Sequence, residues 1–348
     1  MRGLRHSQVT ITQVAREAGV STQTVSRVIN NRPDVSPHTR ERVEGVVARL
    51  GYQPNAIARS LIRRRSQTLG VVATGLEYFG STRTLAGIER AANRLGLSLL
   101  LCLLPEPATD NGERVMRSLL ARQVDGIIWA VPEIGDNRAW LRATVPQLGV
   151  PVVFLSMAPR DGLPVLTMDN RGGGQLAVAH LLAQGYQKIG LITGPDDWWE
   201  ARERQAGWQA ALALAGRPAE AHQRVAGDWS ASSGERGLHQ LLAQYPELDA
   251  VFASNDQMAL GLLQAARRLG RRVPDDLAVV GFDDIPEAAY FFPPLTAIRQ
   301  GLTELGAQAV LAITHHIDAA DEDGPRPKPH ALEPELIVRA SSTPHRQG

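Results

Sequence analysis

Four polar side chains near the start of a short apolar-patterned segment have the chemistry to read a DNA duplex. They are Thr22, Gln23, Ser26 and Arg27. A glutamine can bind an adenine edge through two hydrogen bonds, and an arginine can bind a guanine edge or a phosphate. A helical hairpin that binds no DNA would show the same spacing, so the spacing alone leaves that alternative open.

Three short helices are predicted over residues 10–52, and they would position these side chains. The first ends at Gly19, where the chain needs a tight turn. The second covers residues 22–30, with Ser21 as its N-terminal cap. The third spans residues 37–50 and has proline at its first position. Two helices joined through Gly19 form a candidate helix-turn-helix, whose second helix enters the major groove with its N-terminus first.

The charge of the chain is divided unevenly, and the division supports this reading. Residues 1–66 carry 12 Arg, no Lys and 4 acidic residues, a net charge of +8. The remainder carries 25 basic and 32 acidic residues, a net charge of −7, so the whole chain has a net charge of only +1. A basic head on an acidic body predicts a polyanionic partner at one end. The alternative is a solvated basic surface without a partner.

The body of the chain shows the pattern of a parallel α/β sheet. From Leu69 onward, short apolar runs alternate with amphipathic helical stretches, which is typical of βαβ units. There are more runs than one compact unit needs, so we expect two similar, doubly wound lobes with a cleft between them. The predicted strands lie within residues 69–74, 97–104, 126–131, 151–156, 188–194, 250–255 and 277–284.

Two polar residues follow these apolar runs directly. Asn255 follows VFAS and Asp283 follows VVGF. The carboxyl ends of parallel strands are where α/β sheets bind ligands. An amide and a carboxylate can both bond to hydroxyl groups. The alternative for Asp283 and Asp284 is a capping or loop pair.

Sequence patterns for catalysis, metals and cofactors are missing. Cys102 is the one cysteine, which excludes an intramolecular disulfide and a cysteine zinc cage. His315 and His316 are adjacent and would point to different helix faces. Asp283 and Glu200 could mimic the carboxylate pair of a glycosidase, but nothing favours that over hydroxyl binding. We expect no catalytic residue, no metal and no cofactor.

The hydrophobic segments favour a chain outside the membrane. No apolar stretch approaches the length of about 18 residues that a spanning helix requires. The first residues, MRGLRHSQVTITQ, lack the apolar region of a secretory signal. We therefore expect a cytoplasmic protein with no membrane partner.

The motifs of the head resemble the DNA-binding domain of the LacI/GalR family of bacterial regulators. Residues 14–61 contain, in order, VA-x-x-AGVS, TVSRV-x-N, VS-x-x-TR-x-RV and LGY-x-PN-x-x-A-x-x-L. The body continues the resemblance and is closest in appearance to the lactose-repressor branch and to cellobiose-responsive members. The supporting segments are STRTLAGIERAANRLG, AGWQAAL, GDWSASSGE, SNDQMALG, VVGFDDIPEA and PPLTAIRQ.

The resemblance implies an α/β protein: a three-helix helix-turn-helix head and a two-lobed core like periplasmic binding proteins, built on doubly wound parallel sheets. The head covers residues 1–52, a hinge covers 53–66 and the effector-binding core covers 67–344. The expected near lobe covers about 67–168 and 300–329, and the expected far lobe about 169–299 and 330–344.

The resemblance also assigns DNA contacts to the hinge. Asn55 is among them, and residues 55–63 are expected to form a helix on the minor groove. Leu61 stands where the family places a leucine that wedges between base pairs and kinks the duplex. Arg59 would neutralise nearby phosphates.

Four body residues stand where the family holds its ligand. Arg204, Asn255 and Asp283 would bond to sugar hydroxyls, and Trp229 would stack on the ring. The alternative for Trp229 is a packing aromatic. Two positions depart from the lactose-repressor branch, because Ser156 replaces an aspartate and Glu200 replaces a serine. The specificity of that branch therefore does not carry over.

The family's function implies a repressor that binds palindromic double-stranded operator DNA as a homodimer and is released by a small sugar of the β-glucoside or β-galactoside type. Tyr78 and Phe79 would line the near lobe and suit a disaccharide. One alternative is a sugar-binding receptor or carbohydrate enzyme with a basic head. A second keeps the family but makes the ligand a corepressor, as in purine-responsive members.

Overall fold

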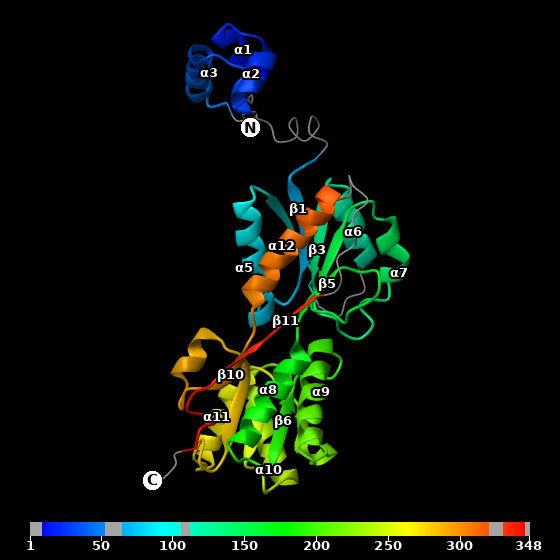
Figure 1. Cartoon of the computed structure of the whole chain (residues 1–348), viewed down its shortest axis with the longest axis vertical. Coiled ribbons are helices and arrows are strands. Elements are labelled where there is room, and N and C mark those ends of the chain that lie inside the picture. The colour runs from blue at the N-terminus through cyan, green and yellow to red at the C-terminus, as the bar shows by residue number, and fades with distance from the viewer. Residues whose placement is uncertain (1–8, 53–64, 106–111, 320–329, 345–348) are drawn as a thin grey trace, which may run out of the picture. The chain divides into compact units, whose positions relative to one another are not determined.

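The computed structural model describes residues 9–52, 65–105, 112–319 and 330–344 (Figure 1). The chain divides into two compact units, Met1–Ser66 and Gln67–Gly348. Most of the predicted hinge, with Asn55, Arg59 and Leu61, lies outside the described residues.

The head is a three-helix unit whose caps follow the sequence prediction. α1 (Ile11–Ala18) begins with a capping box between Thr10 and Gln13 and ends at Gly19, which has φ +61°. α2 (Thr22–Ile29) is capped by the side chain of Ser21. α3 (Pro37–Leu50) has proline in its first turn. Seven buried side chains form the core: Val14, Ala15, Ala18, Val25, Val28, Val43 and Val46.

The near lobe of the body is a six-stranded parallel sheet with the strand order β11-β5-β4-β3-β1-β2. Helices α5 and α12 lie side by side on one face, and α6 and α7 cover the other (Figure 1). Its strands are β1 (Thr68–Ala73), β2 (Ser98–Leu103), β3 (Gly126–Ala130), β4 (Val152–Leu155), β5 (Val165–Met168) and β11 (His330–Leu332). Its helices are α5 (Phe79–Arg94), α6 (Gly112–Leu120), α7 (Leu141–Thr144), η1 (Val145–Gln147) and α12 (Leu302–Ala319).

The far lobe repeats this plan with the order β12-β10-β9-β8-β6-β7. Its one departure is β12, which runs antiparallel to β10 at the edge, so this sheet is not wholly parallel. Its strands are β6 (Ile189–Thr193), β7 (Arg224–Ala226), β8 (Ala250–Ala253), β9 (Ala278–Asp283), β10 (Thr296–Arg299) and β12 (Glu335–Ile337). Its helices are α8 (Asn170–Ala183), α9 (Trp199–Leu214), η2 (Ala221–Gln223), α10 (Ala231–Gln244), α11 (Asp256–Arg268) and η3 (Pro286–Tyr290).

The chain crosses between the lobes three times, from β5 to α8, from β10 to α12 and from β11 to β12. The last crossing differs from the expected border at about residue 330, because His330–Leu332 pairs with β5 of the near lobe. The far-lobe segment therefore begins a few residues later, beyond β11.

All seven predicted strands are present, and five short ones were missed: β5, β7, β10, β11 and β12. Each has only three or four residues and includes a polar one, whereas the predicted four-residue strands β4 and β8 are wholly apolar. In the far lobe, α9 begins at Trp199, and Glu200 in its first turn faces the cleft region.

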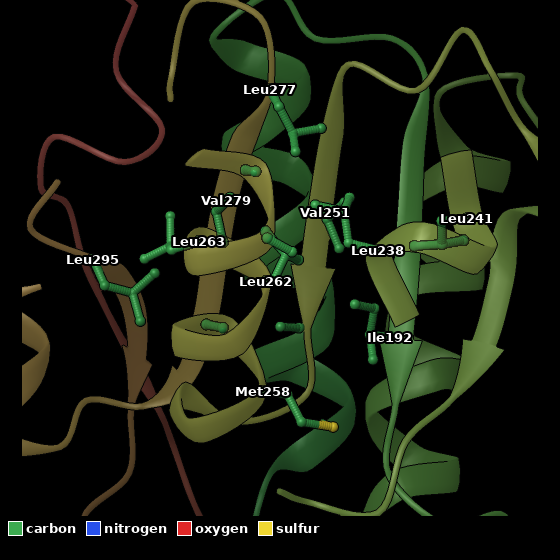
Figure 2. Close-up of a cluster of buried hydrophobic side chains, with 14 of the residues drawn as sticks. Ile192, Leu238, Leu241, Val251, Met258, Leu262, Leu263, Leu277, Val279 and Leu295 are labelled. Atoms are coloured by element: carbon green, nitrogen blue, oxygen red, sulfur yellow. The ribbon is translucent and has the colours of Figure 1, made fainter. Parts of the chain in front are cut away.

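The inner strands of each sheet are buried on both faces, which explains their continuous apolar runs, whereas the edge strand β2 is half exposed. In the far lobe, one core lies between the sheet and α10 and α11, and Figure 2 shows Ile192, Val251 and Leu262 within it. A second core lies against α8 and α9 on the other face. A rigid sheet packed in this way holds the residues at its strand ends in fixed positions.

Helices α8 and α9 approach each other closely because of two glycines. A Cβ on Gly174 would lie 2.4 Å from the carbonyl oxygen of Arg204, and a Cβ on Gly207 would lie 2.1 Å from that of Arg171. Neither space admits a methyl group. This contact fixes the position of Arg204 relative to the carboxyl ends of the strands.

Among the described helices, none combines the length and apolar character that crossing a membrane would require.

The α8–α9 contact generates a stability prediction. Gly207→Ala should destabilise the body by about 1–3 kcal/mol, because the new methyl group forces two backbones apart. Gly80→Ala in α5 is the matched control, since a Cβ there meets nothing within 4 Å. Thermal unfolding of both variants makes the comparison. Equal melting temperatures for the two would contradict the close-packing argument.

Candidate functional site

The candidate DNA-reading residues gather on the outer side of α2. Thr22, Gln23 and Arg27 are exposed and Ser26 is half-buried, while the valines of the same helix face the core. Arg27 lies 3.5 Å from Asp34, and both side chains remain about half exposed. An exposed ion pair of this kind is weak, so the guanidinium stays available for another partner.

The loop after α2 is tied to α3 by one arginine. Arg40 donates through Nη1 to the Asn31 side-chain oxygen at 3.0 Å and through Nη2 to the Arg32 carbonyl oxygen at 2.6 Å. The angle between α2 and α3 is thereby held by side-chain bonds as well as by the small core.

The candidate ligand site is a cavity of about 440 Å³ between the two lobes of the body. Residues from both lobes line it, including Tyr78 and Phe79 from the near lobe. All six predicted ligand residues contribute to its wall: Ser156, Glu200, Arg204, Trp229, Asn255 and Asp283.

The topology explains why these distant residues meet. Ser156 follows β4, Trp229 follows β7, Asn255 follows β8 and Asp283 ends β9. Parallel strands deliver their carboxyl ends to one edge of a sheet, and a cavity at that edge collects the residues that follow. Glu200 and Arg204 share one face of α9, because they are four positions apart.

Backbone strain marks the same edge. Ser156 has φ +53°, Trp229 +70°, Asp283 +114° and Asp284 +53°. These conformations are costly for residues other than glycine and tend to cluster at ligand sites. The side chain of Asp256 supports the turn, because its Oδ2 accepts from the amide of Ile285 at 2.8 Å.

Arg204 is the central cation of the cavity. Its Nε donates to Asn170 Oδ1 at 2.8 Å and its Nη1 to the Ser254 carbonyl oxygen at 2.5 Å. Its guanidinium carbon lies 3.8 Å from the centre of the Phe282 ring. Within the described chain, Nη2 makes no hydrogen bond, so it can donate to a bound molecule.

Two carboxyl groups share this arginine. Asp283 Oδ1 lies 3.9 Å from Arg204 Nη1 and accepts from Gln300 Nε2 at 2.6 Å. Burial raises the pKa of Asp283 to about 6, although Arg204 and Gln300 act in the opposite direction. Burial also raises the pKa of Glu200, against the attraction of Arg204 and a hydrogen bond with Ser156. Burial lowers the pKa of Arg204, and these two carboxylates oppose that shift.

Aromatic rings form the wall beside these charges. The rings of Trp198 and Trp229 meet edge to face at 5.6 Å, and those of Tyr78 and Trp198 at 5.3 Å. Trp229 lies against Gly194, where a Cβ would be 2.2 Å from its ring. Asn255 fixes the backbone of Trp229, since its Nδ2 donates to the Trp229 carbonyl oxygen at 3.0 Å.

Two of the residues that sequence reasoning missed hold the site's charged groups in place. Gln300 bonds Asp283, and Asn170 orients Arg204. Gln300 directly follows β10 and Asn170 follows β5 closely, so strand-end reasoning would have found them if these four-residue strands had been recognised.

A larger groove of about 1440 Å³ lies in the near lobe beside α7. Two of its charged groups pair with each other, Arg160 with Glu133 at 2.5 Å. Its walls otherwise carry mainly valine, leucine and proline side chains. In the described part of the chain, no group of three or more His, Cys, Asp or Glu residues is placed to hold a metal ion.

A helix-turn-helix head and a two-lobed core with a polar cleft define a class of ligand-responsive DNA-binding regulators. Residues 10–55 match the family of "bacterial regulatory proteins, lacI family", and residues 178–342 match a "periplasmic binding protein-like domain". The chain belongs to the lacI family of bacterial regulatory proteins.

Individual relatives cover most of the chain. The lactose operon repressor of Escherichia coli (strain K12) is 35% identical over 87% of this chain and 83% of its own length. The ribose operon repressor of the same strain is 37% identical over 88% of this chain and 93% of its own length. Both relatives are operon repressors.

Two solved structures share the whole architecture. The Lac repressor dimer bound to operator and the anti-inducer ONPF has a TM-score of 0.87 at 33% identity and covers 97% of this chain and 99% of that one. A CelR–cellobiose complex has a TM-score of 0.69 at 32% identity and covers 96% of this chain and 99% of that one.

The raised pKa of Asp283 predicts that Asp283→Asn stabilises the folded protein, and that this gain in stability depends on pH. Between its ordinary pKa of 3.8 and about 6, the folded protein keeps a proton that the unfolded chain releases. The ionised side chain therefore lowers stability increasingly as pH rises, and the cost is complete above pH 6. The variant should match the wild type near pH 4 and exceed it by about 1–3 kcal/mol at pH 7.5. Denaturant unfolding at both pH values measures this, and a less stable variant at pH 7.5 would contradict it.

Proposed function

We propose that this chain is a transcriptional repressor that binds a palindromic operator as a homodimer and is released when a small β-linked sugar fills the cleft. The observation that carries the proposal is the pairing, in one cavity, of Arg204, Asp283 and Asn255 with the aromatic wall of Trp198 and Trp229.

This cavity has the chemistry that a pyranose requires. A guanidinium clamps neighbouring hydroxyls, a carboxylate accepts from them, and an amide does both. An indole face suits the C–H side of the sugar ring. The volume of about 440 Å³ falls within the ordinary range for small-molecule sites.

The charge balance inside the cavity also fits a neutral ligand with many hydroxyl groups. Glu200 and Asp283 face one arginine, Arg204, and a second arginine, Arg138, acts electrostatically on Glu200. Four carboxyl groups and one arginine line the cavity, so a neutral ligand suits it better than an anion. A sugar with β-glucoside or β-galactoside linkage matches this better than a charged nucleotide.

The relatives support both the operator binding and the sugar binding in the proposal. One solved relative is a dimer bound to operator, and another is a complex with cellobiose. On the DNA side, the exposed face of α2 offers Thr22, Gln23 and Arg27 to base edges and phosphates. The net charge of +8 on residues 1–66 supplies the electrostatic attraction.

Sugar binding in the cleft and operator binding by the head would be coupled through the arrangement of the two lobes. A ligand that bonds to Ser156 of the near lobe and Arg204 of the far lobe binds better when the lobes are close. If the arrangement of lobes that holds sugar differs from the one that holds operator, each ligand weakens the other by the same factor. Typical couplings are about 1–3 kcal/mol.

Operator binding with and without sugar tests the proposal. Cellobiose and lactose should weaken binding of the wild-type protein to a palindromic duplex, measured by fluorescence anisotropy. Asp283→Asn should bind the same duplex normally but respond at least tenfold less to sugar, because a charge-assisted bond is about twice as strong as a neutral one. Asp276→Asn is the control, since Asp276 pairs with Arg272 away from the cavity.

Three results would change this conclusion. Tighter operator binding in the presence of sugar would make the ligand a corepressor. Turnover of a β-glycoside would favour the enzyme alternative. If neither sugar bound at all, the proposed class of effector would be wrong.

The homodimer has candidate surfaces on both lobes. In the far lobe, Tyr290 and Phe292 are 88% and 85% exposed. In the near lobe, Leu101 and Leu103 on the edge strand β2 are 43% and 49% exposed. Large apolar groups gathered at a surface favour contact with another protein, and a second copy of this chain is the partner proposed here.

Substituting one of these aromatics should weaken the dimer. Phe292→Ser should shift the monomer–dimer equilibrium toward monomer by about tenfold or more, as expected for the loss of a buried aromatic anchor. Leu214→Ser is the matched control, because Leu214 is equally exposed at 85% but stands alone on α9. Sedimentation velocity over a concentration series measures the shift. A stable tetramer, or an equal effect of both substitutions, would contradict the assignment.

A further inference from the structure

The two lobes are joined by backbone hydrogen bonds at a place away from the three crossing segments. The amide of Gly135 donates to the Asp197 carbonyl oxygen at 3.0 Å, and the amide of Trp199 donates to the Glu133 carbonyl oxygen at 3.0 Å. Ile134 and Trp198 face each other as an antiparallel bridge between these bonds. The near-lobe partner is the loop after β3, and the far-lobe partner is the loop after β6.

Strand order shows that this contact is separate from the crossings. In the near lobe, β4 lies between β3 and β5, from which the chain crosses. In the far lobe, β8 and β9 lie between β6 and β10. The lobes are thus joined by covalent chain at one part of their edges and by a two-bond bridge at another. A rotation about the crossing segments that opens the cleft must break the bridge.

The near-lobe loop is held rigidly by Glu133, which is 8% exposed. Its amide donates to the Ser156 carbonyl oxygen at 3.0 Å. Its carboxylate accepts from the Ala158 amide at 2.8 Å and pairs with Arg160 at 2.5 Å. Glu133 therefore connects the loops after β3 and β4 and presents its own carbonyl oxygen to the far lobe.

Two neighbouring side chains fix the rest of that loop. Asn137 Nδ2 donates to the Pro132 carbonyl oxygen at 2.9 Å, and its Oδ1 accepts from the Ile134 amide at 3.1 Å. The buried Arg138 donates to the same Oδ1 at 3.0 Å. Because these bonds order the loop in advance, little conformational entropy is lost when the bridge forms.

Trp198 connects the bridge to the cavity. Its backbone lies in the bridge, while its ring contacts Tyr78 of the near lobe and Trp229 of the cavity wall. A molecule seated against these rings therefore rests on a residue whose backbone position depends on the bridge.

We propose that Glu133–Gly135 and Asp197–Trp199 form an interlobe clasp that holds the cleft shut and must open for ligand exchange. The clasp is set by backbone bonds of the chain itself. Its role in ligand exchange rests on the proposed function, because it requires the cavity to bind an effector.

One substitution removes a clasp bond while leaving its helix intact. Trp199 occupies the first position of α9, where proline is favoured, so Trp199→Pro deletes the amide donor and preserves the helix. Trp199→Ala is the matched control, because it removes the same side chain and keeps the amide. Trp199 does not line the cavity.

Hydrogen exchange of the Gly135 amide without ligand is the first measurement, because that amide is protected by the remaining clasp bond. Exchange in Trp199→Pro should be about fivefold or more faster than in Trp199→Ala, the effect of one backbone hydrogen bond. Equal exchange in the two variants would overturn the clasp.

A second variant tests the clasp without altering α9, so a local defect in that helix cannot explain its result. Arg160→Gln leaves α9 untouched and removes the ion pair that anchors Glu133. It should also accelerate Gly135 exchange relative to the wild type, and unchanged exchange would overturn the role of Glu133 as the anchor of the clasp.

Stopped-flow dissociation of cellobiose, followed by tryptophan fluorescence, is the second measurement. Trp199→Pro should release cellobiose faster than Trp199→Ala by a factor similar to the one for exchange. Unchanged release with faster exchange would overturn the gating role. If cellobiose binds none of the proteins, the proposed effector class fails, and the exchange measurement alone decides whether the clasp exists.

Discussion

The arrangement of the body depends on accommodating one buried guanidinium. A charge removed from water is costly unless it is paired and hydrogen-bonded. Arg204 meets this requirement with an amide oxygen, a carbonyl oxygen, two nearby carboxyl groups and an aromatic face. These partners come from helices and strand ends far apart in the sequence. The glycines at the α8–α9 contact are needed because they bring Arg204 within reach of all of them.

The cleft combines a rigid foundation with a contact that can open. Strained backbone at Ser156, Trp229 and Asp283 is held by sheets buried on both faces. Such strain persists only where the surrounding packing enforces it. The contact between the lobes away from the crossings, by contrast, includes two hydrogen bonds and the edge of Tyr78. The lobes can therefore move as units while each half of the site keeps its shape.

Sequence reasoning succeeded where the signal is local. Ser21 and Gly19 set the ends of the head helices by a cap and a left-handed turn, and the structure has them as expected. Six of the seven longer apolar runs became buried strands, because burial on both faces requires continuous apolar residues, while the seventh became the half-exposed edge strand β2. It failed for β5, β10 and β11, because strands of three or four residues that include a polar side chain are stabilised by their neighbours rather than by their own pattern.

By itself, the sequence determined the two-part organisation, the family and the types of side chain that could face a ligand. Those properties rest on composition, local caps and motif order, which are readable along one chain. Only the tertiary structure decided that Ser156, Glu200 and Asp283 share one cavity, that Gln300 bonds Asp283, and that Glu133 meets Trp199 across the lobes. Such contacts depend on sheet order and helix packing, and these arise from the cooperation of many residues that no local pattern records.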